Sequence, residues 1–325
     1  MKQVFIGIDV SAATLDICIK VNDSFTSVVI NNQIKDIRKF LQPFQQQSVM
    51  IGMENTGRYN WAFYEALSGF EFTTYVISAL HLKKSMGLVR GKNDKIDAER
   101  IVHFLVKNYT ELRPWVCPGS TIQKLKVLIT ERNYRIKSKR QLSTMDKDYA
   151  KMRTLGLERP LAKMNKRLKA ALDAQILEIE KEIEQLLKGD PEIKKQVALI
   201  RSVPGVGKVL SWVIIAKTNG FSSIRTPREM ACYCGVAPFE YQSGTSIYRR
   251  PAVSHLADKT LKSLLHMGAM SAIRLQNDLG EYYRRKVAEG KNKMSVINAV
   301  RNKIIHRIYA VIKNQIIYQN NLVLS

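Results

Sequence analysis

Two short apolar runs in the N-terminal third of the chain each lead directly into an acidic residue. Residues 4–8 are followed by Asp9, and residues 49–53 are followed by Glu54. Runs of this length are typical of buried strands. We therefore expect both acids at strand ends, where an open α/β sheet forms its functional sites.

The segments around these two strands predict a mixed sheet. Alternating segments at 15–19 and 24–30 follow the first strand closely, which predicts an antiparallel meander of three strands. Helices are expected at 34–41 and 59–67, and a fifth strand at 72–77. This order is that of an α/β domain.

Residues 113–120, which contain two prolines and a glycine, interrupt the pattern and predict a domain boundary. Residues 120–189 have a nearly continuous helical pattern. From Leu161 to Leu186 apolar residues recur at spacings of three and four, as in a coiled coil. Further helices are expected at 226–234, 257–276 and 291–317. We expect three regions: an α/β domain at 1–119, a basic helical coiled-coil region at 120–190 and a mainly α-helical domain at 191–325.

The charge of the chain limits its function more than any other property of its composition. It has 52 Lys and Arg against 28 Asp and Glu, a formal net charge of +24. Such an excess favours a polyanionic partner, with nucleic acid ahead of an anionic membrane surface or the ribosome. The apolar content of 45% excludes a chain disordered throughout. No apolar run reaches the roughly 18 residues of a membrane span, so no membrane association is expected.

The four cysteines show neither a disulfide framework nor the paired spacing of a structural zinc site. Reduced thiols and a basic chain together predict a cytoplasmic protein associated with the bacterial nucleoid.

Two segments are candidates for holding a nucleic-acid backbone. Residues 120–170 carry 15 basic and 4 acidic residues, a net of +11. A solvated helix face is the plain alternative to a binding surface there. The Pro-Gly-Val-Gly turn at 204–207 resembles the hairpin of a helix–hairpin–helix, although a simple tight turn is equally consistent. The candidate contacts are Lys137, Lys139, Arg140, Gly205, Gly207 and Lys208.

Two further acids belong to a helix expected at 93–107, which Asn93 or Asp94 would cap. Asp94 and Asp97 are three residues apart and so share one helix face. Each acid alone is more typical of a cap or a salt bridge. If Asp9, Glu54, Asp94 and Asp97 meet, two charges at ~4 Å repel by roughly 4 kcal/mol at an effective dielectric near 20. Such a group needs cations, and Mg²⁺ or Mn²⁺ fits oxygen ligands.

The motifs resemble those of one family over nearly the whole chain. They are GIDVSAATLD (7–16), GMENTGRYN (52–60), GKNDKIDAERI (91–101), SVPGVGKVLS (202–211) and the segment from Phe221 to Ser246. These resemble the DEDD insertion-sequence transposases, and are also similar to the Piv DNA invertase. The resemblance implies an RNase H-like, RuvC-like N-terminal domain and a C-terminal transposase domain. It also implies that Asp9, Glu54, Asp94 and Asp97 are the catalytic, metal-binding tetrad.

The resemblance further implies that Ser243, in Tyr-Gln-Ser-Gly at 241–244, is a nucleophile. Gln242 stands where some relatives carry an acid. His255, the histidine closest in sequence, is more typical of a packing or surface role. The implied reaction is exchange of DNA strands through a phosphoserine, guided by a noncoding RNA that pairs with element ends and target DNA. Exchange needs at least two active sites, which implies a homo-oligomer, a dimer or a tetramer.

Three other functions remain open from the residues alone. A junction resolvase would hydrolyse DNA with the tetrad and would not need Ser243. Residues 7–16 also resemble the first phosphate loop of the actin-type ATPases and sugar kinases. That class needs further glycine-rich loops, which the sequence does not show. A non-catalytic nucleoid-binding protein explains the charge but not the four acids.

Overall fold

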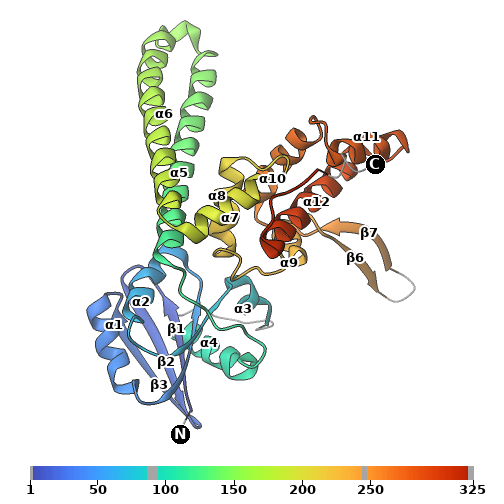
Figure 1. The fold of residues 1–325 in the computed structure, drawn as a ribbon. Coiled ribbons are helices and arrows are strands. Elements are labelled where there is room, and N and C mark those ends of the chain that lie inside the picture. The colour runs from blue at the N-terminus through green and yellow to red at the C-terminus, as the bar shows by residue number, and fades with distance from the viewer. Residues whose placement is uncertain (1–2, 86–93, 244–246, 321–325) are drawn as a thin grey trace. The chain divides into compact units, whose positions relative to one another are not determined.

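The computed structural model describes residues 3–85, 94–243 and 247–320 of the chain (Figure 1). These residues form two compact units, which divide between Cys117 and Pro118. Within the described residues, no helix has the length and apolar character needed to cross a lipid bilayer. The division of the chain into three regions stays a prediction.

The first unit contains a five-stranded mixed sheet. Its strands are β1 (Gln3–Val10), β2 (Thr14–Val21), β3 (Ser24–Asn31), β4 (Ser48–Glu54) and β5 (Thr73–Ile77). They lie in the order β3-β2-β1-β4-β5. The first three strands pair antiparallel, while β4 pairs parallel with both β1 and β5. The predicted meander and mixed sheet are therefore confirmed.

Helices cover both faces of this sheet (Figure 1). On one face, α1 (Ile34–Leu41) and α2 (Trp61–Ala66) pack against the even-numbered residues of β1. On the other, α4 (Asp94–Asn108) packs against its odd-numbered residues. A short helix, α3 (Ala79–Ser85), follows β5.

The second unit begins with two long helices that pack antiparallel, α5 (Ser120–Tyr149) and α6 (Glu158–Lys188) (Figure 1). The expected apolar seam is buried only near its end, where Ile183 is fully buried. Met164 and Leu168 are 66% and 50% exposed, so the prediction was wrong for these two positions of the seam. Polar side chains also join the two helices along their length, with bonds from Arg132 to Glu180, from Lys139 to Asp173 and from Lys169 to Asp146.

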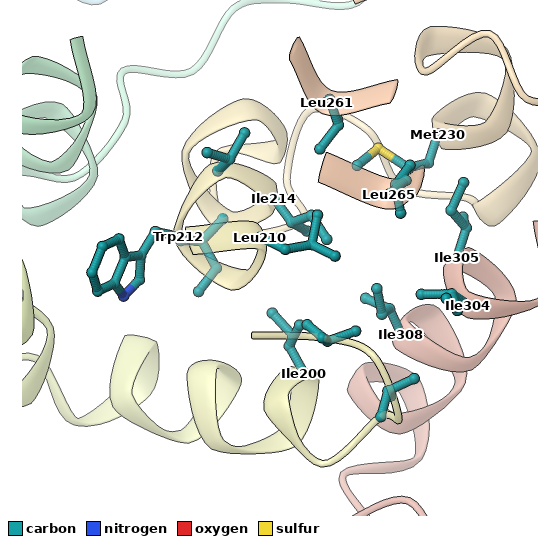
Figure 2. Close-up of a cluster of buried hydrophobic side chains, with 14 of the residues drawn as sticks. Ile200, Leu210, Trp212, Ile214, Met230, Leu261, Leu265, Ile304, Ile305 and Ile308 are labelled. Carbon is teal, nitrogen blue, oxygen red and sulfur yellow. The ribbon is translucent and has the colours of Figure 1, made fainter. Parts of the chain in front are cut away.

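The remainder of the second unit is a helical bundle around one apolar core. Its helices are α7 (Pro191–Arg201), α8 (Lys208–Thr218), α9 (Pro227–Tyr233), α10 (Lys259–Ala272), α11 (Asp278–Ala288) and α12 (Lys293–Asn314). Figure 2 shows the core, in which Leu210 and Ile214 of α8 face Leu265 of α10 and Ile304 of α12. The first unit and this bundle agree with the expected change from α/β to mainly helical structure.

Two features of the bundle were not predicted. One is α11, whose start is set by Asn277, because its side chain accepts a hydrogen bond from the backbone N–H of Gly280. The other is an antiparallel strand pair, β6 (Pro238–Ser243) and β7 (Ile247–Val253). Its register shifts between Phe239 and Tyr241, and this irregularity removes the strict alternation by which a sequence pattern is recognised.

The Pro-Gly-Val-Gly turn at 204–207 joins α7 to α8 and is fitted tightly against α10. Gly205 has a φ of +85°, and a Cβ at this position would overlap the carbonyl oxygen of Gly268. The contact is reciprocal, because a Cβ on Gly268 would lie 2.7 Å from the carbonyl oxygen of Gly205. These two glycines therefore let the turn and α10 touch through their backbones.

We expect Gly205→Ala to destabilise the second unit strongly, because it combines a left-handed backbone with a steric overlap. Gly290→Ala is the matched control, since Gly290 has a φ of +80° and open space around it. The control should lower the free energy of unfolding by about 1 kcal/mol, the cost of the backbone conformation alone. Gly205→Ala should lower it by about 3 kcal/mol or more. Equal losses in urea unfolding would contradict the packing role.

Candidate functional site

Asp9 and Glu54 lie side by side on neighbouring parallel strands. The register pairs Ile8 of β1 with Met53 of β4, and each acid is the next residue along its strand. Side chains two residues apart share one face of a sheet. Asp9 therefore shares the face of Gly7, and Glu54 shares the face of Gly52.

Helix α4 packs on this same face. A Cβ at Gly7 would overlap the backbone of α4 at Ala98, and a Cβ at Gly52 would lie 3.1 Å from Ile101. The ring of Tyr109, just beyond the end of α4, lies 5.6 Å from the ring of Phe5. The helix thus runs antiparallel to β1, and its first turn lies toward the strand ends that carry Asp9 and Glu54.

That first turn contains Asp94 and Asp97, so the fold brings their backbone positions toward the other two acids. Asp97 accepts a hydrogen bond from the guanidinium of Arg100 at 2.7 Å, and both side chains are about one-fifth exposed. The side chain of Asp94, and residues 91–93 of the predicted motif with the expected cap Asn93, lie outside the described residues.

A fifth acid, Asp16, was missed by the sequence analysis. The antiparallel register places Asp16 of β2 directly opposite Asp9, so both side chains lie on the α4 face. Cys18, two residues further on the same face, is buried against α4. Burial and the charge of Glu99 raise the pKa of its thiol, which therefore stays neutral. The tight turn between β1 and β2 was the signal that could have revealed Asp16.

The donor set on this face suits a hard divalent cation, because it consists of carboxylates. Among the side chains that the structure describes, no three acidic, His or Cys groups are close enough together to hold an ion. A complete site would thus need Asp94 as well. Asp9, Glu54, Asp94 and Asp97 therefore stay predicted ligands.

Ser243 belongs to the second unit. It is the last residue of β6 and pairs with Ile247, the first residue of β7. This position is where the strand pair ends, and Gln242 beside it is exposed. His255 is exposed as well. The side chain of Ser243 lies outside the described residues, so its role as a nucleophile stays a prediction.

Comparisons with known proteins match both halves of this architecture. A transposase family model matches residues 6–147, and the model of the transposase IS116/IS110/IS902 family matches residues 197–284. The chain belongs to the IS110-type DEDD transposases. It is therefore an enzyme that acts on DNA.

Several relatives align with the chain over most or half of its length. The pilin gene-inverting protein of Moraxella bovis is 26% identical over 96% of this chain and 97% of its own length. The transposase for insertion sequence element IS1111A of Coxiella burnetii is 21% identical over 98% of this chain and 92% of its own. A probable family 20 transposase of Pseudomonas aeruginosa is 24% identical over 50% of this chain and 48% of its own.

The predicted basic contacts on the long helices of this transposase differ in their surroundings. Some are exposed, and one is held in an ion pair. Lys137 and Arg140 on α5 are exposed. Lys139 faces α6 instead and donates to both carboxylate oxygens of Asp173, at 2.6 and 2.7 Å. This ion pair joins the two helices, so Lys139 is less suited than its neighbours to contact a phosphate.

The three predicted contacts at the α7–α8 turn also differ in their surroundings. Gly205 packs against α10, as described above. Gly207 caps α8 with open space where its side chain would be. The ammonium of Lys208 lies 3.8 Å from a carboxylate oxygen of Glu184. Gly207 and the free N–H groups of the first turn of α8 thus fit a phosphate best among the three.

We expect the exposed cations of α5 to set the salt dependence of DNA binding. Replacing both Lys137 and Arg140 with Gln should reduce the slope of log K against log salt by about 2, since each phosphate contact on duplex DNA contributes about 0.9. Lys139→Gln removes the same kind of charge from the same helix but from within an ion pair. It should leave the slope near wild type, and fluorescence anisotropy of labelled duplex measures both. Equal slopes in all three proteins would contradict this surface.

Proposed function

We propose that the protein exchanges DNA strands with a RuvC-like carboxylate site and a serine nucleophile. The observation that carries the proposal is the convergence of Asp9, Glu54 and the first turn of α4 on one sheet face. The sheet order, with three antiparallel strands followed by two parallel ones, supports an RNase H-like and RuvC-like fold. The family membership supports action on DNA.

In this proposal Asp9, Glu54, Asp94 and Asp97 would hold Mg²⁺ or Mn²⁺. Bound there, the ions would supply charge neutralisation for the phosphate and for the attacking and leaving oxygens. The Oγ of Ser243 attacks phosphorus and loses its proton, while the phosphorus–oxygen bond to the sugar breaks and the sugar oxygen takes up a proton. A sugar hydroxyl of the partner strand then attacks the phosphoserine and releases Ser243. The number of phosphodiester bonds is unchanged, so no ATP is needed.

The serine and the carboxylates belong to different compact units of the chain. Two strands must be cut for an exchange, so the proposal requires at least two copies of the chain in one complex. We propose a homodimer or a tetramer.

We also propose that a noncoding RNA guides the reaction. The second unit is rich in cations suited to backbone contact, while site-specific insertion requires a choice among ~10⁶–10⁹ genomic positions. Base pairing by an RNA supplies that choice while the protein holds the backbone. Target and element-end DNA would then be recognised mainly through the RNA.

Loss of any tetrad carboxylate should abolish metal-dependent cutting. Asp9→Asn, Glu54→Gln, Asp94→Asn and Asp97→Asn should each lower the rate of cutting element-end DNA by at least about 100-fold, because a ligand charge is lost while the shape is kept. DNA binding should stay near wild type. Asp23→Asn, at a fully exposed acid of the same unit, is the control and should cut normally. Full activity of the wild type in EDTA would exclude the metal site.

Ser243→Ala should abolish both the covalent intermediate and strand joining, because alanine has no hydroxyl to attack phosphorus. A nicked suicide substrate should trap wild-type protein as a DNA adduct on a denaturing gel. Ser263→Ala, at an exposed serine of α10, is the control and should still form the adduct.

Hydrolysis without an adduct, unaffected by Ser243→Ala, would instead indicate a junction resolvase.

The guide RNA is tested in the same assay. Site-specific joining by protein that has been stripped of RNA with RNase would show that the protein reads the sequence itself.

A further inference from the structure

A cavity of about 630 Å³ lies in the second unit, and none of the residues that line it has been assigned a role above. Helices α11 and α12 form two of its walls, and the chain beyond α12 contributes Tyr318. Its volume is within the range of about 300–1,000 Å³ that is usual for small-ligand sites in proteins. Ala299, Ala310 and Val311 give it an apolar part, and the remaining lining is polar or aromatic.

The charge of the cavity is positive. Lys303 places its ammonium 4.5 Å above the ring centre of Tyr282, and no described carboxylate lies within ion-pair distance of it. Asp278 is the one acid in the lining, and it is doubly engaged. It forms an ion pair with Arg307 and accepts a hydrogen bond of 2.6 Å from the hydroxyl of Tyr318. Helix α12 itself contains no acid, so the cavity attracts anions.

Two aromatic rings line the same cavity as the cations. Tyr282 comes from α11, and Tyr318 comes from the chain after α12. The backbone N–H of Tyr318 donates to the hydroxyl of Ser202 at 2.9 Å, which fixes this segment on the end of α7. Rings held beside cations are the combination that binds a base and its phosphate together.

The cavity also contains an unused hydrogen-bond acceptor. The side-chain oxygen of Asn302 is buried and has no partner in the structure. A buried acceptor without a donor costs free energy, so a turn of the Asn302 side chain toward the cavity, to accept from an N–H or O–H group of a ligand, would relieve that cost. Nucleobases and ribose both carry such donors.

We propose that this cavity binds one unstacked nucleotide of a single-stranded nucleic acid. The base lies against Tyr282 or Tyr318, its donor group reaches Asn302, and the phosphate lies beside Lys303. A base within a duplex cannot enter, because it is stacked between its neighbours and paired. The inference rests on the proposed function in so far as the strand comes from the nucleic acids of the reaction. Its chemistry suits RNA and DNA alike.

Binding of labelled 12-nucleotide strands to the full-length protein tests the site. Single-stranded RNA, single-stranded DNA and duplex DNA are measured separately by fluorescence anisotropy. Tyr282→Leu should weaken single-strand binding roughly tenfold through loss of stacking, while Tyr282→Phe keeps the ring and should bind as wild type. Neither change should alter duplex binding by more than about twofold. The strand type that loses more affinity is the natural ligand.

Lys303→Gln and Lys313→Gln separate the cavity from general charge. Lys313 is an exposed lysine of the same helix that does not line the cavity, so both variants lose one charge from α12. Lys303→Gln should weaken single-strand binding several-fold more than Lys313→Gln. A photoreactive strand, with 4-thiouridine in RNA or 5-iododeoxyuridine in DNA, should crosslink to the peptides that contain Tyr282 or Tyr318.

Equal losses for the two lysine variants, or crosslinks confined to other peptides, would overturn the nucleotide site. Thermal unfolding of each variant excludes a folding defect as the cause of lost binding. Strand joining of element-end DNA, measured on the same proteins, separates the two hypotheses. If the wild type joins element-end DNA but the Tyr282 and Lys303 variants bind single strands as the wild type does, this inference alone is rejected. If the wild type binds no nucleic acid at all, the proposed function is rejected.

Discussion

The direct contact between α4 and the sheet is the constraint on which the candidate site depends. Gly7 and Gly52 have no side chains to hold the helix away, so the backbone of α4 at Ala98 lies against β1. A larger residue at Gly7 would move the helix outward and carry Asp94 and Asp97 with it. Each of these glycines is two residues before an acid, Asp9 or Glu54. The strands β1 and β4 therefore determine both how closely α4 approaches the sheet and that the two acids lie on the face that α4 covers.

The first unit could be predicted well because its strands are local and regular. Three strands joined by tight turns predict their own pairing, and an apolar run that ends in an acid predicts a strand end. The strand pair β6–β7 could not be predicted in this way, because its register shift removes the alternation. Met164 and Leu168 had helical spacing but are exposed, because Lys169 and Asp146 occupy the contact between α5 and α6 instead. The spacing of apolar residues predicts which side chains share a helix face, but it does not predict what that face packs against.

The candidate site was predicted in part for the same reason. Asp9 and Glu54 were found because parallel strands end at one edge, and the register bears out their proximity. Asp16 was missed because its place depends on the pairing of β1 with β2, which the tight turn between the two strands indicates but the spacing of the acids along the chain does not. Ser243 carries no local signal, since a serine before glycine is an ordinary turn residue, and its assignment rests on the family motif alone.

The distribution of charge gives a physical reason for dividing the chain into two units. Residues 1–117 hold 14 basic and 11 acidic residues, a net of +3, so residues 118–325 hold +21 of the total +24. A carboxylate site within a strongly cationic unit would be neutralised by its own lysines and arginines, as Arg100 already does for Asp97. If the carboxylates hold divalent ions as proposed, placing most of the cations in another unit would let the same chain attract a polyanion with fewer lysines and arginines competing for the acids. The proposed reaction would then require both units to act on the same nucleic acid, which would make that nucleic acid a natural part of the assembly.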